Sequence, residues 1–294
     1  PPWAADMHSA GLVLHPRRDS AAAVEAVLGW AGNRNIEILG IEDEIVRLDC
    51  AAVGVPPEEL GRRADLLVSL GGDGTMLRAM RLADGQRAPV LGVNLGKLGF
   101  LAEVDVPDLP GALSAIDDHE FTVEPRLAVD AELRGRRITA FNDIAVVRVP
   151  GEGSAVVAVR VGGQPFVSYS ADAVVVATPT GSTAYSFSAG GPITSPSVEA
   201  LLVTPAAPHS AYSRGVVLSV HDEVTLELLP TSGRLAVEVD GQVEGYVSPG
   251  ERLDLRARPS AARVVRLGLT TFYQRARRKL RLTDSAEIPQ DGDH

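Results

Sequence analysis

Apolar and polar positions follow two alternating patterns over residues 1–121 of the chain. Short apolar runs, typical of buried strands, occur at residues 11–15, 36–42, 64–70 and 88–94. Helical spacing occurs between and after them, at residues 20–32, 75–84 and 107–118. Because strands that alternate with helices pair in parallel, this pattern predicts an open α/β domain over residues 1–121.

The pattern changes near residue 122. β-branched segments separated by Gly, Pro or Ser turns occur at residues 126–140, 156–163, 173–178, 215–220, 223–229 and 234–241. They predict a second, mostly β domain over residues 122–269. Residues 270–282 are basic and predicted to be helical or extended, and residues 285–294 are predicted to form a mobile tail.

The composition is that of an ordinary globular protein. The chain has 294 residues, 45% hydrophobic and 22% charged, which is enough to bury two cores and argues against disorder. A net charge of -10 disfavours nucleic acid and anionic membranes as partners. With no apolar stretch long enough to span a bilayer, no secretory signal pattern and one cysteine, Cys50, we expect a cytoplasmic protein without internal disulfides.

A Gly-Gly-Asp-Gly turn at residues 71–74 follows the third predicted strand, at the sheet edge where α/β proteins bind ligands. Glycines allow a ligand to approach the backbone, and the amides that begin the next helix suit a phosphate. The carboxylate of Asp73 would repel a phosphate unless a cation lies between them. We therefore expect Asp73 to bind a metal or accept a proton. A tight turn with a solvated aspartate is the alternative.

Two further stretches carry polar groups that could bind a ligand. The segment ATPTGSTAYSFSAGGPI (177–193) contains seven Ser, Thr and Tyr residues, which could donate to a sugar or base. The segment FNDIAVV (141–147) places Asn142 beside Asp143 at the start of an apolar run. A plain polar loop and a plain turn are the alternatives. The sequence lacks a Walker loop, a GxGxxG fingerprint after these strands, and the HExxH and GxSxG motifs.

Four stretches, in this order and spacing, closely resemble the NAD kinases: GGDGTMLRA, GVNLGKLGFLAEVD, FNDIAVV and TPTGSTAYSFSAGGPI. The resemblance covers the chain from the first strand to about Phe272. It implies transfer of the γ-phosphoryl group of ATP to the 2′-hydroxyl of the adenosine ribose of NAD, yielding NADP, with Mg²⁺ as the metal ion. Some bacterial members also accept inorganic polyphosphate.

The resemblance also implies an architecture. Members combine a Rossmann-like, phosphofructokinase-like N-terminal α/β domain with a C-terminal β-sandwich-like domain. The last segment, here residues 270–294, returns to the N-terminal domain. Members are homodimers or homotetramers whose NAD site lies near a subunit interface.

The family's roles can be carried over residue by residue near the first motif. Asp73 matches the general base that accepts the proton of the ribose hydroxyl, and Gly74 lets the ribose approach. Arg78, one helical turn further, matches a position that can meet a phosphate, and a solvated helix arginine is the alternative. Phe100 is expected to line the pocket. No residue is assigned as a metal ligand.

The remaining matches concern the dinucleotide. Asn142 and Asp143 match an Asn-Glu pair that holds the ribose, with the acid one methylene shorter here. Asp172 matches the acid of a Gly-Asp-Gly, although Ala171 and Ala173 flank it in this chain. The adenosine pocket is matched by Thr183, Ala184, Tyr185, Ser186, Phe187 and Ser188, and Gln242 matches a polar ligand contact.

Several alternatives stay open at this point. Tyr185 could fill the core, Gln242 could be an exposed hairpin residue, and the basic run from Arg275 to Lys279 is interpreted as a solvated face or an oligomer contact. A lipid kinase with the same GGDGT turn and an NAD sensor without turnover are the competing functions. The phosphoryl donor, the use of NADH, the subunit number and feedback by NADP(H) are left open.

Overall fold

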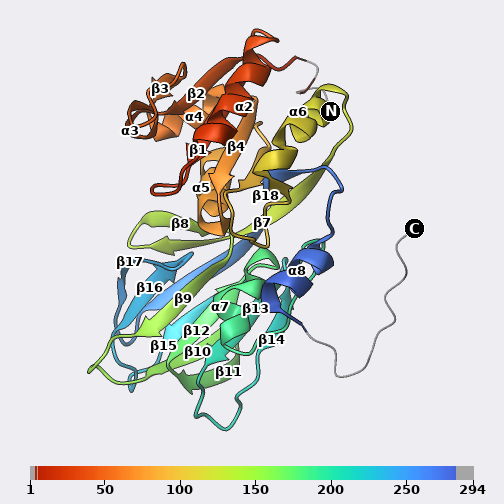
Figure 1. The fold of residues 1–294 in the computed structure, drawn as a ribbon. Helices are drawn as coiled ribbons and strands as arrows, with labels where there is room; N and C mark the ends of the chain where they lie inside the picture. Colours follow the sequence, from red (N-terminus) through yellow and green to blue (C-terminus); the bar gives the residue numbers. More distant parts are fainter. Residues whose placement is uncertain (1–3, 5, 283–294) are drawn as a thin grey trace, which may run out of the picture.

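The computed structural model of the protein describes residue 4 and residues 6–282. Figure 1 shows an α/β domain, built from the N-terminal part of the chain, above a β domain built from most of the remainder. The tail predicted to be mobile, residues 285–294, lies outside the described residues. None of the helices in the described ranges has the length and apolar character needed to cross a bilayer.

Parallel strands in the order β5–β4–β1–β2–β3 form the centre of the N-terminal domain. They are β1 (Ser9–Leu14), β2 (Glu37–Ile41), β3 (Val53–Val55), β4 (Leu66–Gly71) and β5 (Val90–Asn94), and the short β6 (Val104–Asp105) pairs with β5. Every residue of β1, β4 and β5 is buried, as is usual for a parallel sheet covered on both faces. These three neighbouring strands end at the same edge, where such sheets bind ligands.

Helices cover both faces of this sheet. Their bounds are α2 (Ala21–Gly32), α3 (Glu42–Val46), α4 (Pro57–Arg63), α5 (Asp73–Ala83) and α6 (Leu109–Asp117). Helices α2 and α6 pack on one face, and α4 and α5 pack on the other. Met76 and Met80 of α5 lie four residues apart and are both fully buried, because they share the face that meets the sheet. Helix α5, which begins at Asp73, is thereby fixed against β4.

Two long strands, β7 (Thr122–Leu133) and β18 (Arg252–Arg266), pair along their length and pass through both domains. The first part of β18 pairs with β15 (Val224–Leu228) of the C-terminal domain. Its last part pairs with β5 of the N-terminal domain, where Val264 lies opposite Val90. The ladder between β7 and β18 changes register between Arg258 and Ala262. A single hydrogen-bonded sheet therefore continues from one domain into the other.

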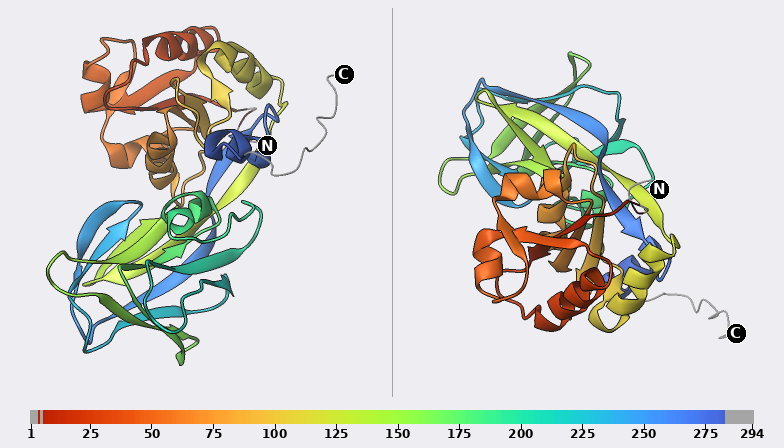
Figure 2. Two further views of the ribbon diagram at one scale, coloured as in Figure 1. Left: turned by 60° about the horizontal axis from the view of Figure 1, so that its bottom comes forward. Right: turned by 90° about the horizontal axis from the view of Figure 1, so that it is seen from above.

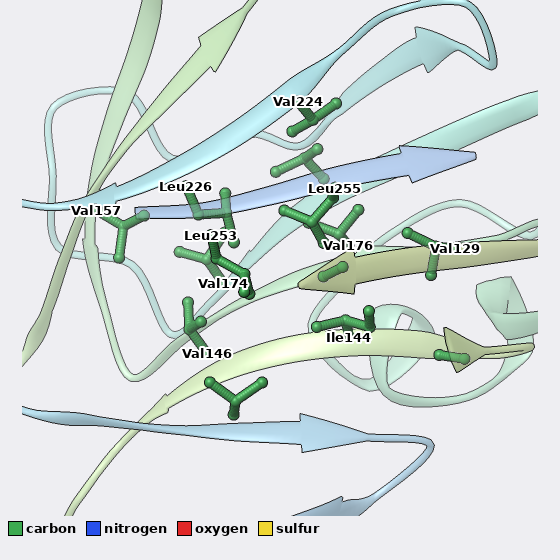
Figure 3. Close-up of a cluster of buried hydrophobic side chains, with 14 of the residues drawn as sticks. Val129, Ile144, Val146, Val157, Val174, Val176, Val224, Leu226, Leu253 and Leu255 are labelled. Carbon is green, nitrogen blue, oxygen red and sulfur yellow. The ribbon is translucent and has the colours of Figure 1, made fainter. Parts of the chain in front are cut away.

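The C-terminal domain consists of this sheet and a second, antiparallel sheet that packs against it. Its remaining strands are β8 (Arg136–Ala140), β9 (Asp143–Arg148), β10 (Ala155–Val161), β11 (Gln164–Ala171), β12 (Ala173–Ala177), β13 (Ala200–Ala206), β14 (Val216–Ser219), β16 (Leu235–Val239) and β17 (Gln242–Val247). The second sheet has the order β14–β13–β12–β9–β16–β17. Alternate residues of β9, such as Ile144 and Val146, point into the core and face Leu226 and Leu253 of the first sheet (Figure 3).

The predicted fold class is confirmed, with an N-terminal α/β domain and a C-terminal antiparallel β domain. Each strand and helix expected before residue 121 overlaps an observed element. Residues 270–282, for which helix and extended chain were both open, contain helix α8 (Phe272–Leu280). The boundary between residues 121 and 122 stays a prediction. The pairing of β7 with β18, which joins the domains, was not predicted.

The core of the C-terminal domain gives the first testable prediction. Leu226→Ala removes a fully buried side chain, and we expect it to lower the free energy of unfolding by about 2 to 5 kcal/mol. Urea denaturation followed by circular dichroism would measure this loss. Leu269→Ala is the matched control, since Leu269 is 52% exposed, and it should change the free energy by about 0.5 kcal/mol at most. Equal losses in the two variants would contradict the assigned core.

Candidate active site

A cavity of about 610 Å³ lies where β1, β4 and β5 end, and we call it the GGDG cavity. The segments after these strands contribute His15, Asp73 and Lys97 to its wall. Gln242, at the start of β17, and Lys279, on α8, line it as well. The cavity is therefore formed by both domains and by the C-terminal helix.

Asp73 is the first residue of α5, and backbone amides hold its carboxylate. The amide of Phe100 donates to both carboxylate oxygens, at 3.1 and 3.0 Å, and the amide of Leu101 donates to Oδ1 at 3.1 Å. A Cβ on Gly99 would lie 2.2 Å from Oδ1, so a larger residue there would displace the carboxylate. The position of Asp73 is thus set by the loop that follows β5.

The glycines of the GGDG motif serve different structural purposes. A Cβ on Gly71 would lie 2.2 Å from Oγ1 of Thr75, so this glycine lets α5 begin close to β4. A Cβ on Gly74 would meet nothing within 4 Å, and Gly74 lines the cavity. The open space beside Gly74 leaves room for a ligand next to Asp73.

Arg18 lines the GGDG cavity and has one unsatisfied guanidinium nitrogen. Its Nη1 is buried and has no hydrogen-bond partner among the described residues, and it would lie 3.6 Å from a Cβ on Gly72. The turn that carries Arg18 is closed by Nδ1 of His15, which accepts from the amides of Arg17 and Arg18 at 3.1 and 3.0 Å. Burial and the nearby arginines lower the pKa of His15, which keeps the imidazole a neutral acceptor.

Two other arginines on the cavity wall are already paired. Arg78 donates to the Glu44 carboxylate and to the carbonyl of Leu14, so its guanidinium is already bound on the cavity wall, although the side chain stays partly exposed. Arg81 donates to the carboxylate of Asp240 at 2.8 Å. Arg18 is therefore better placed than Arg78 to meet a phosphate directly.

Asp240 joins α5 to the Asn142–Asp143 segment. Its carboxylate accepts from the amides of Phe141, Asn142 and Asp143, at 3.2, 2.7 and 3.2 Å, in addition to Arg81. Asp240 has a φ of 47°, and Gly241 follows with a φ of 82° in the turn between β16 and β17. The sequence indicated a hairpin next to Gln242, but the contacts of the Asp240 carboxylate were not predicted from it, although an Asp-Gly pair at a strand end was visible.

The side chain of Asp143 is shielded from solvent and lies near two other carboxylates. It is 3% exposed, and burial, followed by the charges of Asp240 and Glu238, raises its pKa to about 7. Tyr185 lies near these acids, and burial together with Glu238 and Asp143 raises its pKa. Asp143 can therefore carry a proton near neutral pH and donate a hydrogen bond.

The hydroxyl-rich loop packs against the same segment through η2 (Thr180–Thr183) and α7 (Tyr185–Ser188). The carbonyl of Asn142 accepts from the amide of Thr178 at 2.9 Å. A Cβ on Gly181 would lie 2.0 Å from that oxygen, so glycine is needed for this close approach. Tyr185 packs against a small apolar cluster on the outer face of the second sheet. Tyr185 therefore fills part of a core, as one of the two alternatives expected, but its side chain stays partly exposed.

The hydroxyls of this loop have local partners. Ser186 is fully buried, with its Oγ 3.2 Å from Oγ1 of Thr204. Thr183 donates to the carbonyl of Thr180, and Ser188 donates to that of Ala184. Phe187 is 38% exposed. These residues therefore form a compact unit with one apolar ring outside it.

The structure brings the predicted site residues together in two groups. Asp73, Gly74, Arg78 and Gln242 line the GGDG cavity. A second group surrounds the start of β9 and contains Asn142, Asp143, Thr183, Ala184, Tyr185, Ser186, Phe187 and Ser188. The contact of Arg81 with Asp240 links the two groups.

Two predicted residues lie near these groups but do not line the GGDG cavity. Phe100 is not among the residues that line the GGDG cavity, although its amide binds Asp73. Asp172 precedes β12 and forms a partly exposed ion pair with Arg148 at 2.9 Å. Its negative charge also contributes to the raised pKa of Tyr185 in the second group.

The interpretation of the run from Arg275 to Lys279 as a solvated face holds for Arg277 and Arg278, which are exposed, but was wrong for Arg275 and Lys279. Arg275 is only 2% exposed, and its Nε donates to the carbonyl of Phe100 at 2.9 Å. Lys279 donates to the carbonyl of Leu98 at 2.8 Å and lines the cavity. Helix α8 thus contacts the loop that holds Asp73. Within the described residues, no cluster of three His, Cys, Asp or Glu side chains could hold a metal ion.

Comparison with known proteins identifies the class of this two-domain fold. Residues 52–121 match the family model of the ATP-NAD kinase N-terminal domain, and residues 141–267 match that of the ATP-NAD kinase C-terminal domain. NAD kinase 1 of Streptomyces avermitilis is 39% identical, covering 96% of this chain and 89% of that protein. NAD kinase of Desulforamulus reducens is 36% identical, covering 94% and 98%. The chain belongs to the NAD kinase family.

Solved structures of similar fold agree with this. An NAD kinase from Archaeoglobus fulgidus in complex with ATP superimposes with a TM-score of 0.73 at 25% identity, covering 93% of this chain and 98% of that one. Yeast NADH kinase complexed with NADH superimposes with a TM-score of 0.83 at 24% identity, covering 97% and 90%. The match to the yeast structure concerns the fold alone.

The raised pKa of Asp143 predicts a dependence of stability on pH. The folded protein binds the Asp143 proton more tightly than the unfolded chain does. The stabilisation by this bound proton is therefore complete at acidic pH and is lost as the pH rises through about 7. Asn cannot ionise. Relative to the wild type, we therefore expect the unfolding free energy of Asp143→Asn to rise by about 2 to 3 kcal/mol between pH 5 and 8.

Urea denaturation at both pH values would measure this difference. The exposed Asp108→Asn serves as the control and should follow the wild type at each pH. A difference between Asp143→Asn and the wild type that stays constant with pH would show that Asp143 ionises in the folded protein as it does in the unfolded chain.

Proposed function

We propose that this protein is an NAD kinase that transfers the γ-phosphoryl group of ATP to the 2′-hydroxyl of the adenosine ribose of NAD. The hydroxyl oxygen forms a bond to the γ-phosphorus, the bond from that phosphorus to the ADP oxygen breaks, and NADP and ADP leave. The observation that carries the proposal is the Asp73 carboxylate, held by two amides beside the open backbone of Gly74. Similarity to NAD kinases from several bacteria supports the same reaction.

In this proposal Asp73 is the general base. A ribose hydroxyl is a weak nucleophile, and a positioned carboxylate can accept its proton as the phosphoryl group moves. The amides of Phe100 and Leu101 fix the carboxylate on one side, while the side toward Gly74 stays open to the cavity. Phosphoryl transfer depends mainly on positioning and charge neutralisation, and a fixed base suits that requirement.

The donor phosphates would bind among the cationic groups of the GGDG cavity. Arg18 offers an unsatisfied nitrogen, Lys97 lines the same wall, and the first amides of α5 favour an anion. Mg²⁺ typically binds through one or two carboxylates together with substrate phosphates, and Asp73 is the carboxylate on this wall that faces the open side of the cavity, since Glu44 already binds Arg78 and the amide of Leu14. When bound, Mg²⁺ would neutralise charge on the transferring phosphoryl group. Inorganic polyphosphate could use the same groups.

NAD would extend from the GGDG cavity toward the second group of residues. The adenosine would lie against the loop from Thr183 to Ser188, and the Asn142–Asp143 pair would hold a ribose. A protonated Asp143 could donate to a sugar hydroxyl as well as accept from one, which offsets its shorter side chain. Gln242 lies on the cavity wall between the domains and could reach either substrate.

A homodimer or homotetramer and a cytoplasmic location stay predictions. Exposed apolar side chains on the C-terminal domain support self-association, notably Val217, which is 61% exposed, and Phe187. The role expected for Asp172 at a subunit interface also stays a prediction, and its partial exposure is compatible with it.

The central test is a coupled assay that contains protein, NAD, ATP and Mg²⁺, with NADP detected by a dehydrogenase. The wild type should form NADP, and Asp73→Asn, which keeps the shape but removes the base, should lower kcat by about 100-fold or more. Parallel reactions with polyphosphate or NADH would identify the donor and acceptor. Wild-type turnover by Asp73→Asn would exclude the base role.

Two other outcomes would replace the proposed function. Tight NAD binding without NADP formation would identify a sensor. Phosphorylation of diacylglycerol in place of NAD would identify a lipid kinase.

The cationic groups that line the GGDG cavity give a separate prediction. Arg18→Met removes the unsatisfied guanidinium nitrogen, and we expect the KM for ATP to rise by about 10-fold while the KM for NAD changes little. The same coupled assay, with each substrate varied in turn, would measure both constants. Arg17→Met is the control on the neighbouring position, since Arg17 does not line the GGDG cavity. An increase in the KM for NAD alone would place Arg18 at the dinucleotide.

A further inference from the structure

One peptide group connects Arg275 to the proposed catalytic base. Nε of Arg275 donates to the carbonyl oxygen of Phe100 at 2.9 Å. The amide of Leu101, which belongs to the same peptide group, donates to Oδ1 of Asp73 at 3.1 Å. Because a peptide group is planar, fixing the carbonyl also fixes the direction of the N–H on its other side. A chain of two hydrogen bonds thus runs from Arg275 through this peptide to Asp73.

Arg275 is itself held firmly. Its Nη1 donates to the carbonyl of Thr270 at 2.8 Å and lies 3.2 Å from the Thr270 hydroxyl. Helix α8 begins with a capping box in which Thr271 and Gln274 bond to each other's backbone amides. Figure 1 and the left view of Figure 2 show α8 at the level where the two domains meet. The guanidinium is therefore fixed by its own helix as well as by the loop.

Two neighbouring side chains hold other carbonyls of the same loop. Arg266, at the end of β18, donates to the carbonyl of Leu101 at 2.6 Å, and Lys279 donates to that of Leu98 at 2.8 Å. Each of these groups comes from the C-terminal part of the chain, more than 160 residues after the loop. Arg275 differs from both because its carbonyl partner shares a peptide group with an amide that binds Asp73.

The charge of Arg275 is retained in spite of its burial. Burial and the nearby Arg266 lower its pKa to about 10, and Glu103 acts in the opposite direction. The guanidinium is therefore cationic at neutral pH. Hydrogen bonds in a chain polarise one another, so a cationic donor at the carbonyl strengthens the N–H as a donor at the other end.

We propose that Arg275 is a positioning residue for phosphoryl transfer, which orients and polarises the Phe100–Leu101 peptide group so that its N–H holds the Asp73 carboxylate. This inference rests on the proposed role of Asp73 as the base. The substrate class is unchanged. In this proposal Arg275, a buried residue of the C-terminal helix, acts on the reaction without touching a substrate.

The test compares substitutions at Arg275 with a substitution on the exposed side of the same helix. Arg275→Met keeps a long side chain without donors, and we expect kcat to fall by about 10-fold to 100-fold, with KM values for NAD and ATP within about 3-fold of the wild type. Arg275→Lys keeps the charge and one donor and should recover part of the lost kcat. Arg278→Met, at an exposed position, should leave kcat unchanged.

A double-mutant cycle separates positioning of Asp73 from a structural role. If Arg275 acts through Asp73, Arg275→Met should change kcat by less than about 2-fold when Asp73 is already Asn. The same fractional loss in both backgrounds would overturn the inference, as would a lower melting temperature with unchanged kcat. If the double variant is inactive, the kcat of the two Arg275 single variants decides, and Arg275→Lys decides if Arg275→Met does not fold.

The cycle also tells the two proposals apart. Full activity of Asp73→Asn would remove the base role and, with it, the inference about Arg275. A strongly impaired Asp73→Asn combined with additive effects at Arg275 would leave the base role in place and reject the inference alone.

Discussion

Carboxylates held by backbone amides set the geometry of this protein's site. Asp73 accepts from the loop after β5, and Asp240 accepts from the segment that begins β9. Helix α5 lies between them, since it begins at Asp73 and sends Arg81 to Asp240. Eight residues of helix span about 12 Å, so α5 sets the separation between the proposed base and the segment proposed to hold a sugar. A shift of α5 would disturb both at once.

Charged groups are buried where the domains meet, and their arrangement is specific. Arg126, Arg266 and Arg275 are each less than 10% exposed, and Glu103 and Glu124 are the nearby acids. Burying such groups costs more free energy than a well-packed apolar cluster would, so stability alone does not explain them. Arg266 and Arg275 donate to carbonyls of the loop before β6, whereas Arg126 donates to Thr180 and Glu124. We infer that Arg266 and Arg275 of this cluster fix the backbone of the loop that holds Asp73.

The sequence predicted those parts of the site whose signals are local. A glycine-rich turn after an apolar run, a hydroxyl-rich loop and an Asn-Asp pair are visible within a few residues, and the α/β and β patterns placed them in the right domains. Asp240 and Arg275 were missed because the groups they bind lie far along the chain. Arg18 was missed because a nitrogen that lacks a hydrogen-bond partner has no signal in the sequence. A basic run on a short helix looks solvated until the loop it contacts is known.

The continuity of β18 changes what the domain boundary means. Because this strand pairs with β15 in one domain and with β5 in the other, a fragment ending at residue 121 would leave part of the edge of β5 unpaired and prone to aggregation. The fragment would also lack Arg266 and α8, which hold the loop around Asp73. The N-terminal domain carries the motif, yet it cannot be cut out as an independent module. For protein engineering, the smallest transferable unit of this site is the whole two-domain chain.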